Sequence, residues 1–178
     1  KMSGKANSVF NIMPMTFILP KEYVGFLEAF TEFEEQEGKF NYWIMKPAAS
    51  SRGRGIQVIN DISSVTYGEP MVMQRYLKNP LLLNGFKFDL RIYVLVTSVN
   101  PLEMFIYKEG FGRFSTVPYN LDPNDKHNRY IHLTNYRINK YNKNRDPVNN
   151  DEISGGCKVS LETLKKKIEA AYDISWDR

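Results

Sequence analysis

The amino-acid sequence predicts an α+β fold in which mostly antiparallel strands pack against a few helices. Apolar residues recur at helical spacing between residues 20 and 38 and again after residue 160. Between these two segments they form short runs, one of which alternates with charged residues as a half-buried strand does. The runs are separated by short connections, which join antiparallel neighbours and are too short for parallel crossovers. Helices at the two ends and an antiparallel β layer between them are therefore expected.

The first predicted helix lies between Pro20 and Gly38, since proline near the start and glycine beyond the end are typical of helix boundaries. Glutamates occupy one of its faces, which is more typical of a solvated surface than of a catalytic cluster. The last predicted helix has Ser160 as its N-cap and packs through the apolar residues that follow. The first helix is expected to be part of the scaffold.

The predicted strands are short apolar segments that end at proline, glycine or asparagine. They are residues 42–46, 56–59, 71–77, 85–97, 104–108, 111–117 and 130–136. The loop at 48–55 contains glycines and arginines, so its backbone N–H groups and guanidinium groups can close over a polyphosphate. The same residues are equally typical of a simple turn.

The central segment, residues 85–97, has the clearest pattern. Lys87, Asp89 and Arg91 alternate with apolar residues, so the three charges share one face of a strand and the apolar residues share the other. Successive charges on that face are roughly 6.5–7 Å apart, and the row is about as long as a ribose with its phosphates. We interpret it as a binding site, although such patterns also occur on ordinary solvent-exposed faces.

Composition excludes several classes of function. The 178 residues are 42% hydrophobic, enough for one sizeable core or two small lobes, and the net charge of +4 favours an acidic or phosphorylated partner. This excess is too small for a dedicated nucleic-acid binder, and no apolar run approaches the roughly 18 residues of a membrane span. Cys157 is the only cysteine and shares no metal-ligand spacing with the two histidines. No secretory signal peptide is recognisable either.

Seven motifs, in this order and spacing, resemble those of the tubulin tyrosine ligase-like enzymes, and most closely those of the tubulin polyglutamylases. They are residues 14–20, 43–47, 52–56, 74–77, 87–91, 110–114 and 132–136. The resemblance implies a partial ATP-grasp fold. Residues 1–40 would then end an N-terminal domain, residues 41–79 would form the central lobe with the phosphate-covering loop, and residues 80–178 would begin the C-terminal catalytic lobe.

The resemblance also implies an activity. Such an enzyme is an ATP-dependent ligase that adds free L-glutamate to the glutamate-rich tails of tubulin through an acyl phosphate, with Mg²⁺ as a second cofactor. Tubulin and microtubules would be its partners, in the cytoplasm, the cytoskeleton, the axoneme of a cilium or flagellum, or the basal body. The alternatives are a tubulin glycylase or tyrosine ligase, or a non-catalytic nucleotide- or microtubule-binding module.

Site residues follow from the same resemblance. Catalytic roles would belong to Arg91, Lys87 and Arg113. ATP would be bound by Lys46, Arg52, Gly53, Gln74, Arg75, Tyr76, Leu77, Lys87, Asp89, Thr134 and Asn135. The incoming amino acid would be bound by Arg113, Tyr136, Arg137 and Lys158. Arg137 replaces a serine that is usual in the family, which leaves the identity of that amino acid open.

The magnesium ligands of the resembled family are an aspartate and a glutamate-x-asparagine pair. They are expected after Arg178, and no metal ligand is assigned within these residues. Because the metal bridges the phosphates, the 178 residues by themselves are expected to be inactive.

Overall fold

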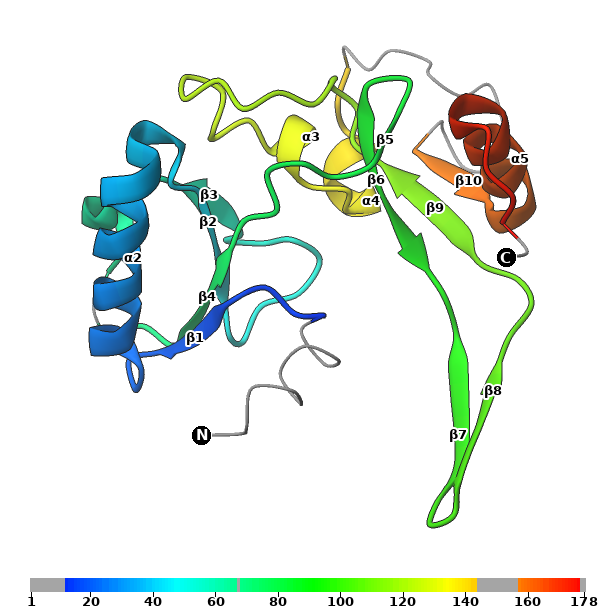
Figure 1. The fold of residues 1–178 in the computed structure, drawn as a ribbon, viewed down its shortest axis with the longest axis horizontal. Coiled ribbons are helices and arrows are strands. Elements are labelled where there is room, and N and C mark those ends of the chain that lie inside the picture. The colour runs from blue at the N-terminus through cyan, green and yellow to red at the C-terminus, as the bar shows by residue number, and fades with distance from the viewer. Residues whose placement is uncertain (1–11, 67, 144–156, 177–178) are drawn as a thin grey trace. The chain divides into compact units, whose positions relative to one another are not determined.

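The computed structural model describes residues 12–66, 68–143 and 157–176. Contacts divide the chain into two compact units. Unit 1 comprises Lys1–Pro80 and Leu121–His127, and unit 2 comprises Leu81–Asn120 and Asn128–Arg178. The predicted α+β fold is confirmed in each unit, because each contains an antiparallel sheet and a covering helix (Figure 1). None of the described helices is both long enough and apolar enough to cross a membrane.

Unit 1 contains a four-stranded antiparallel sheet with the strand order β1-β4-β2-β3. The strands are β1 (Thr16–Leu19), β2 (Trp43–Pro47), β3 (Gln57–Ile59) and β4 (Met71–Arg75). Two 3-10 turns, η1 (Gly38–Phe40) and η2 (Ile62–Ser64), lie in its loops. The helix α2 (Tyr23–Glu37) ends where predicted, at Gly38, whose φ of 56° suits glycine. The hairpin of β2 and β3 is likewise as expected.

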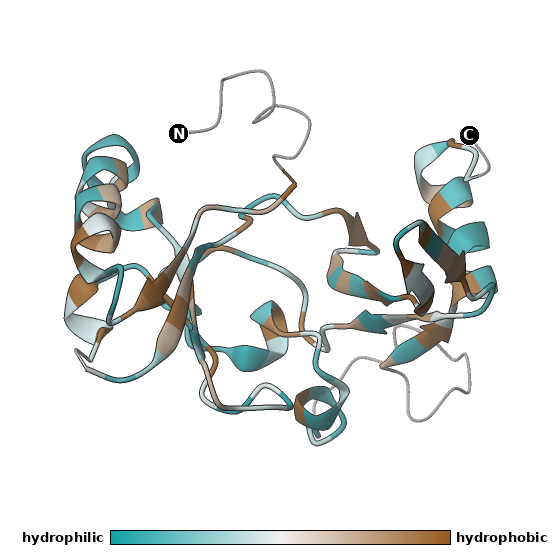
Figure 2. Ribbon diagram, turned by 90° about the horizontal axis from the view of Figure 1, so that it is seen from below, coloured by the Kyte–Doolittle hydropathy of each residue, from teal (hydrophilic) through white to brown (hydrophobic). Residues whose placement is uncertain are grey.

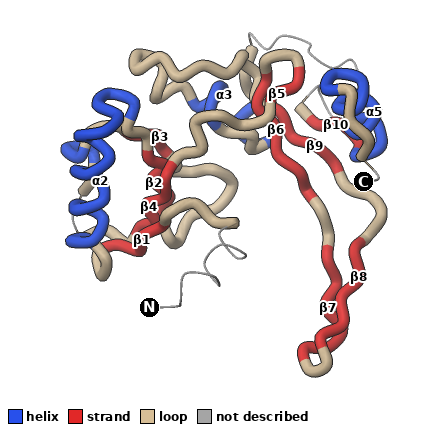
Figure 3. Tube along the Cα trace, viewed as in Figure 1, coloured by secondary structure: helices blue, strands red, loops and turns tan. Residues whose placement is uncertain are grey.

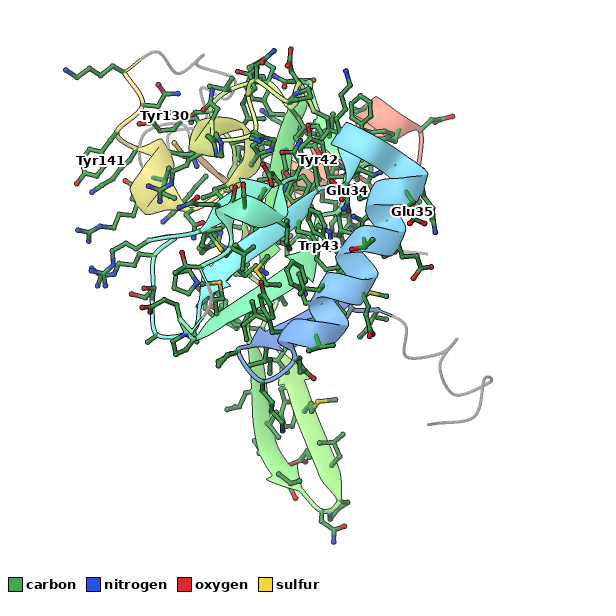
Figure 4. All side chains as sticks on the ribbon, turned by 90° about the vertical axis from the view of Figure 1, so that its left-hand side faces the viewer. Glu34, Glu35, Tyr42, Trp43, Tyr130 and Tyr141 are labelled. Carbon is green, nitrogen blue, oxygen red and sulfur yellow. The ribbon has the colours of Figure 1, made fainter. Side chains whose placement is uncertain are left out.

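The core of unit 1 lies between α2 and one face of this sheet. Trp43 is fully buried, and its ring meets Phe26 edge-on at 5.2 Å and Phe30 in a stacked arrangement at 6.3 Å. Figure 4 shows Trp43 on the sheet beside α2, and Figure 2 shows that α2 alternates between hydrophobic and hydrophilic residues. Aromatic contacts therefore join the helix to the sheet.

Unit 2 contains a second antiparallel sheet with the strand order β10-β9-β6-β5. The strands are β5 (Leu82–Leu83), β6 (Phe86–Arg91), β9 (Phe111–Phe114) and β10 (Lys158–Ser160). The helix α5 (Leu161–Tyr172) packs on one face, and Ser160 caps it as predicted, since its hydroxyl accepts a hydrogen bond from the Thr163 N–H at 3.1 Å. A Cβ atom on Gly112 would lie 2.8 Å from Leu164, so β9 and α5 are in close contact.

The predicted strand at 85–97 is wrong in its extent. It ends at Arg91, and a separate two-stranded ribbon follows, made of β7 (Val94–Val99) and β8 (Leu102–Ile106) (Figure 1). Leu90, Val94 and Val96, predicted to be buried, are 38%, 53% and 50% exposed. The physical reason is that no second layer among the described residues covers the ribbon, so its apolar side chains meet solvent.

The predicted strand at 130–136 is also wrong. This segment contains two short helices, α3 (Arg129–His132) and α4 (Tyr136–Asn139), as Figure 3 shows for α3. The side chain of Asn128 caps α3 by accepting a hydrogen bond from the Tyr130 N–H. The buried amide of Asn139 donates to the Leu133 carbonyl at 2.7 Å and accepts from Thr116 at 2.8 Å. Capping and burial of asparagine therefore favour helical turns here.

Leu164→Ala is expected to lower the free energy of unfolding of unit 2 by about 2–5 kcal/mol, because Leu164 is fully buried between α5 and the sheet. Leu81→Ala is the matched control, since Leu81 is 50% exposed, and its effect should stay within about 0.5 kcal/mol. Denaturant titration measures both variants. Equal effects would contradict the assignment of this core.

Ile106→Lys is expected to reduce self-association of the 178-residue chain, because Ile106 is 74% exposed on the apolar β7–β8 ribbon. The control is Ile18→Lys, which removes an isoleucine that is 57% exposed in β1. Light scattering over a concentration series compares the two. If both substitutions reduce association equally, the ribbon is not its cause.

Candidate functional site

The charged residues of β6 lie on the face of the unit 2 sheet opposite α5. Phe86 and Phe88 belong to the core cluster beneath α5, so the alternation of the strand directs Lys87 and Asp89 away from that core. The predicted alternation is therefore confirmed from Phe86 to Asp89, but not at Leu90, which lies on the predicted core face and is 38% exposed.

Asp89, Arg113 and Lys158 form a row across three neighbouring strands. Asp89 on β6 is opposite Arg113 on β9, and Arg113 is opposite Lys158 on β10. Directly opposite residues of antiparallel strands have Cβ atoms about 4.5–5.5 Å apart, on the same face. We refer to these three residues as the charged row. The register thus brings together residues that are far apart in the sequence.

Asp89 and Arg113 form a two-point ion pair. The Nε–H of Arg113 donates to Oδ1 of Asp89 at 2.9 Å, and its Nη2 donates to Oδ2. This hydrogen bonding is the main cause that raises the pKa of Arg113. Two contacts fix the plane of the guanidinium group, which has five N–H donors in all, so donors remain for a further ligand.

Lys158 lies between two aromatic rings. Its ammonium group is 4.3 Å from the ring centre of Tyr136, at the start of α4, and 5.0 Å from that of Phe111 on β9. Arg113, Tyr136 and Lys158 are therefore brought together, as a shared binding pocket requires. Arg137 follows Tyr136 on α4 and is exposed. The roles of these four residues toward an amino acid stay predictions.

The other predicted residues of unit 2 surround the same strand. The ammonium group of Lys87 donates to the carbonyl of His132 at 3.2 Å, and Arg91 lies 5.4 Å from the ring of Tyr93. Asn135 precedes α4, and its carbonyl accepts the N–H of Ile138. The neighbouring Thr134 is half-buried. Lys87 is thus held against the segment that carries Thr134 and Asn135.

In unit 1, Lys46 and Gln74 contact one another across β2 and β4. Lys46 donates to the side-chain oxygen of Gln74 at 2.7 Å, and Gln74 donates to Thr16 at 2.8 Å. Burial lowers the pKa of Lys46. Lys46 forms no ion pair with any described residue, so it is a partly buried cation beside a neutral amide. Such a group is suited to an anionic ligand.

The loop after β2 contains Arg52 and Gly53, both with positive φ, 61° and 78°. Arg52 is exposed. A Cβ atom on Gly55 would lie 2.6 Å from Pro47, so the end of the loop packs closely on β2. Whether this loop binds phosphate stays a prediction, and its backbone is compatible with a turn.

Arg75 has a structural role that the sequence did not reveal. Its guanidinium group donates to both oxygens of Glu37 at 2.8 Å and to Asn41 at 2.7 Å, and it lies 4.1 Å from the ring of Phe33. The backbone N–H of Arg75 donates to the carbonyl of Met15. This side chain is therefore engaged in joining the end of α2 to the sheet.

Tyr76 and Leu77 follow β4. The N–H of Tyr76 donates to the Tyr42 carbonyl at 3.1 Å, so this donor is already used within unit 1. Tyr76 is buried and Leu77 is 64% exposed. The roles of Gln74, Arg75, Tyr76 and Leu77 toward ATP stay predictions.

The described residues contain no cluster of three or more histidine, cysteine, aspartate or glutamate side chains that could hold a metal ion. Asp89 is the one carboxylate of the charged row, and it is already in an ion pair with Arg113. These residues therefore do not by themselves fit a Mg²⁺ ion.

Antiparallel sheets in two α+β units, with lysine and arginine side chains on strand faces, are consistent with part of an ATP-grasp fold. The chain belongs to the tubulin-tyrosine ligase family, whose family model matches residues 1–177. The resemblance of the seven motifs is thereby confirmed.

Three relatives illustrate the similarity. The chain is 45% identical over 143 residues to tubulin polyglutamylase TTLL5 from Homo sapiens, covering 80% of the chain and 10% of that protein. It is 39% identical over 171 residues to probable tubulin polyglutamylase TTLL2 from Homo sapiens, covering 96% and 28%. It is 39% identical over 155 residues to tubulin monoglutamylase TTLL4 from Mus musculus, covering 87% and 13%. The chain thus spans between 10% and 28% of the length of these relatives.

Glu37→Gln is expected to destabilise unit 1 in a pH-dependent way. Burial acts to raise the pKa of Glu37, but the hydrogen bonds and charges of Lys78 and Arg75 outweigh it and lower that pKa. The ion pairs therefore stabilise the fold above the ordinary glutamate pKa, and this stabilisation is lost as pH falls through the lowered value. At pH 7 the loss should be about 0.5–1 kcal/mol, allowing for solvent screening.

The measurement is denaturant unfolding between about pH 3 and pH 7, the range that spans glutamate titration. The control is Glu34→Gln, since Glu34 is exposed on the same helix and forms no ion pair with a described residue (Figure 4). A difference between Glu37→Gln and the parent chain that does not shrink in acid would refute the ion-pair explanation.

Proposed function

We propose that this chain is part of an ATP-dependent ligase that adds glutamate to the glutamate-rich C-terminal tails of tubulin. The observation that carries the proposal is the charged row, in which Arg113 and Lys158 lie on adjacent strands in direct register. Two neighbouring cations suit a ligand with two carboxylates. The names of the relatives, tubulin polyglutamylases and a tubulin monoglutamylase, support glutamate as that ligand.

Arg113 and Lys158 would bind the incoming glutamate in different ways. Arg113 is oriented by Asp89 and offers its remaining N–H donors in a fixed plane, which suits a carboxylate. Lys158 offers a compact charge beside Tyr136, whose ring centre lies 4.3 Å from its ammonium group. Together they would fix the position of the amino acid, so that its amine can approach an activated carboxyl group.

Bound ATP would supply the phosphoryl group that activates a tail carboxylate as an acyl phosphate, which the amine of glutamate then displaces. Phosphoryl transfer depends mainly on positioning and on stabilisation of negative charge. Lys87 and Arg91 on β6, together with Lys46 on β2, are proposed to provide that charge. The absence of an ion pair at Lys46, within the described part of the chain, supports its assignment to phosphate.

The net charge of +4 supports an acidic tubulin tail as the second substrate. We further propose that the protein acts where this substrate is found, in the cytoplasm and on cytoskeletal microtubules, including those of cilia and flagella.

The test uses the full-length protein with microtubules, Mg²⁺ and ATP, and labelled glutamate, glycine or tyrosine in separate reactions. Label from glutamate alone is expected. Arg113→Ala should reduce incorporation by about 100-fold or more, because it removes a charge-assisted contact and leaves Asp89 unpaired. Arg113→Lys should restore little of it, since an ammonium group cannot form the two-point contact.

Lys166→Met is the control, because Lys166 lies on the exposed side of α5 and pairs only with Glu162 among the described residues. Its incorporation should match the parent protein. Incorporation of glycine or tyrosine in place of glutamate would overturn the proposed amino acid. No incorporation at all would refute the ligase.

A further inference from the structure

Phe111 contacts Lys158 on the face of the unit 2 sheet that is opposite α5. It begins β9 two residues before Arg113 and is paired in register with Ser160, while Arg113 is paired with Lys158. Phe111 and Lys158 are therefore diagonal neighbours on adjacent antiparallel strands, on the same face as the charged row. The ring centre lies 5.0 Å from the ammonium nitrogen. This distance is within the range of a cation–π interaction.

The two rings beside Lys158 come from different elements. Tyr136 begins α4 and Phe111 begins β9, so neither depends on the other for its position. A lysine side chain has four rotatable bonds and is otherwise poorly fixed. Two aromatic contacts restrict its ammonium group to the region beside Arg113. We call Phe111 and Tyr136 the aromatic pair.

The two cations of the charged row are held by different chemistry. Arg113 is held by a carboxylate, which takes up two of its N–H donors. Lys158 is held by rings, and it forms no ion pair with any described residue. A ring attracts a cation through its quadrupole and carries no net charge. Lys158 is thus restrained without being neutralised, and it keeps its attraction for an incoming carboxylate.

We propose that Phe111 is a positioning residue that holds the ammonium group of Lys158 in place for a carboxylate of the incoming amino acid. This inference rests on the proposed function, because it takes Lys158 to contact that amino acid. Phe111 itself touches Lys158 and acts only through it. An aliphatic side chain of similar size would fill the same space but would not restrain the cation.

Steady-state kinetics of the full-length protein test this inference. Phe111→Leu should raise KM for glutamate by about 3- to 10-fold, because one cation–π contact is lost. It should leave kcat and KM for ATP unchanged. Phe111→Tyr, which keeps the ring, should restore KM. In a Lys158→Met background, Phe111→Leu should have no further effect, whereas a general structural defect would persist.

The matched control is Phe40→Leu. Phe40 is 44% exposed in unit 1, and the ammonium group of Lys39 lies 5.5 Å from its ring, so the substitution removes a similar contact elsewhere. It should leave KM for glutamate unchanged. An equal rise in KM for both variants would overturn the proposal, and so would a fall in kcat caused by Phe111→Leu.

A second measurement does not depend on activity. Lysines are converted to ¹³C-dimethyl-lysine, which keeps the positive charge, and the Lys158 resonance is identified by its loss in Lys158→Arg. Ring currents of the aromatic pair should change the chemical shift of this resonance, and Phe111→Leu should reduce that change. If no amino acid is incorporated but the change in chemical shift depends on Phe111, the proposed function fails and the contact stands. A resonance that Phe111→Leu leaves unchanged would refute the positioning role.

Discussion

The burial of apolar side chains between one helix and one face of a sheet is the interaction on which each unit depends. Trp43 fulfils this role beneath α2, and Leu164 fulfils it between α5 and β9. Because side chains alternate along a strand, fixing the core face also fixes the identity of the opposite face. The packing of Phe88 and Val159 on the core side therefore determines that Asp89 and Lys158 emerge together on the open side. The charged row is a consequence of how unit 2 forms its core.

Four cations near the predicted binding residues fall into two groups according to what holds them. Arg75 and Arg113 are paired with carboxylates, Glu37 and Asp89, and the planar guanidinium group makes two contacts in each case. Lys46 and Lys158 are held by a neutral amide and by aromatic rings. At these four positions, the arginines fix geometry through carboxylates, while the two lysines keep a charge that can respond to a ligand. This division explains how a protein with an almost balanced composition can still present positive charge at chosen points.

Part of this arrangement could be predicted from the sequence. The alternation around Asp89, the end of α2 at Gly38 and the cap at Ser160 depend on nearby residues, and all three are found in the structure. The break after Arg91 could not be predicted, because the apolar pattern continues through it and periodicity does not say whether a layer covers a strand. The helical turns near Asn139 depend on Thr116, which is distant in sequence.

The pairing of Asp89 with Arg113 could not be predicted either. It depends on the register between β6 and β9, which no spacing within one strand reveals. The contact of Phe111 with Lys158 has the same origin, although its position two residues before Arg113 was a usable signal. Local pattern therefore predicted which side chains share a face of one strand, and tertiary pairing decided which of them meet across strands.

The close approach of α5 to Gly112 has a consequence for evolution. Gly112 separates Phe111 from Arg113, and a larger residue there would collide with Leu164. Its two neighbours, by contrast, project from the open face, where a substitution changes no packing beneath. Single exchanges on the open side of the sheet can therefore change the charge and shape of this surface, while the packed side preserves the architecture. The positions that can vary and the position that packing constrains are therefore adjacent residues on opposite faces of one strand.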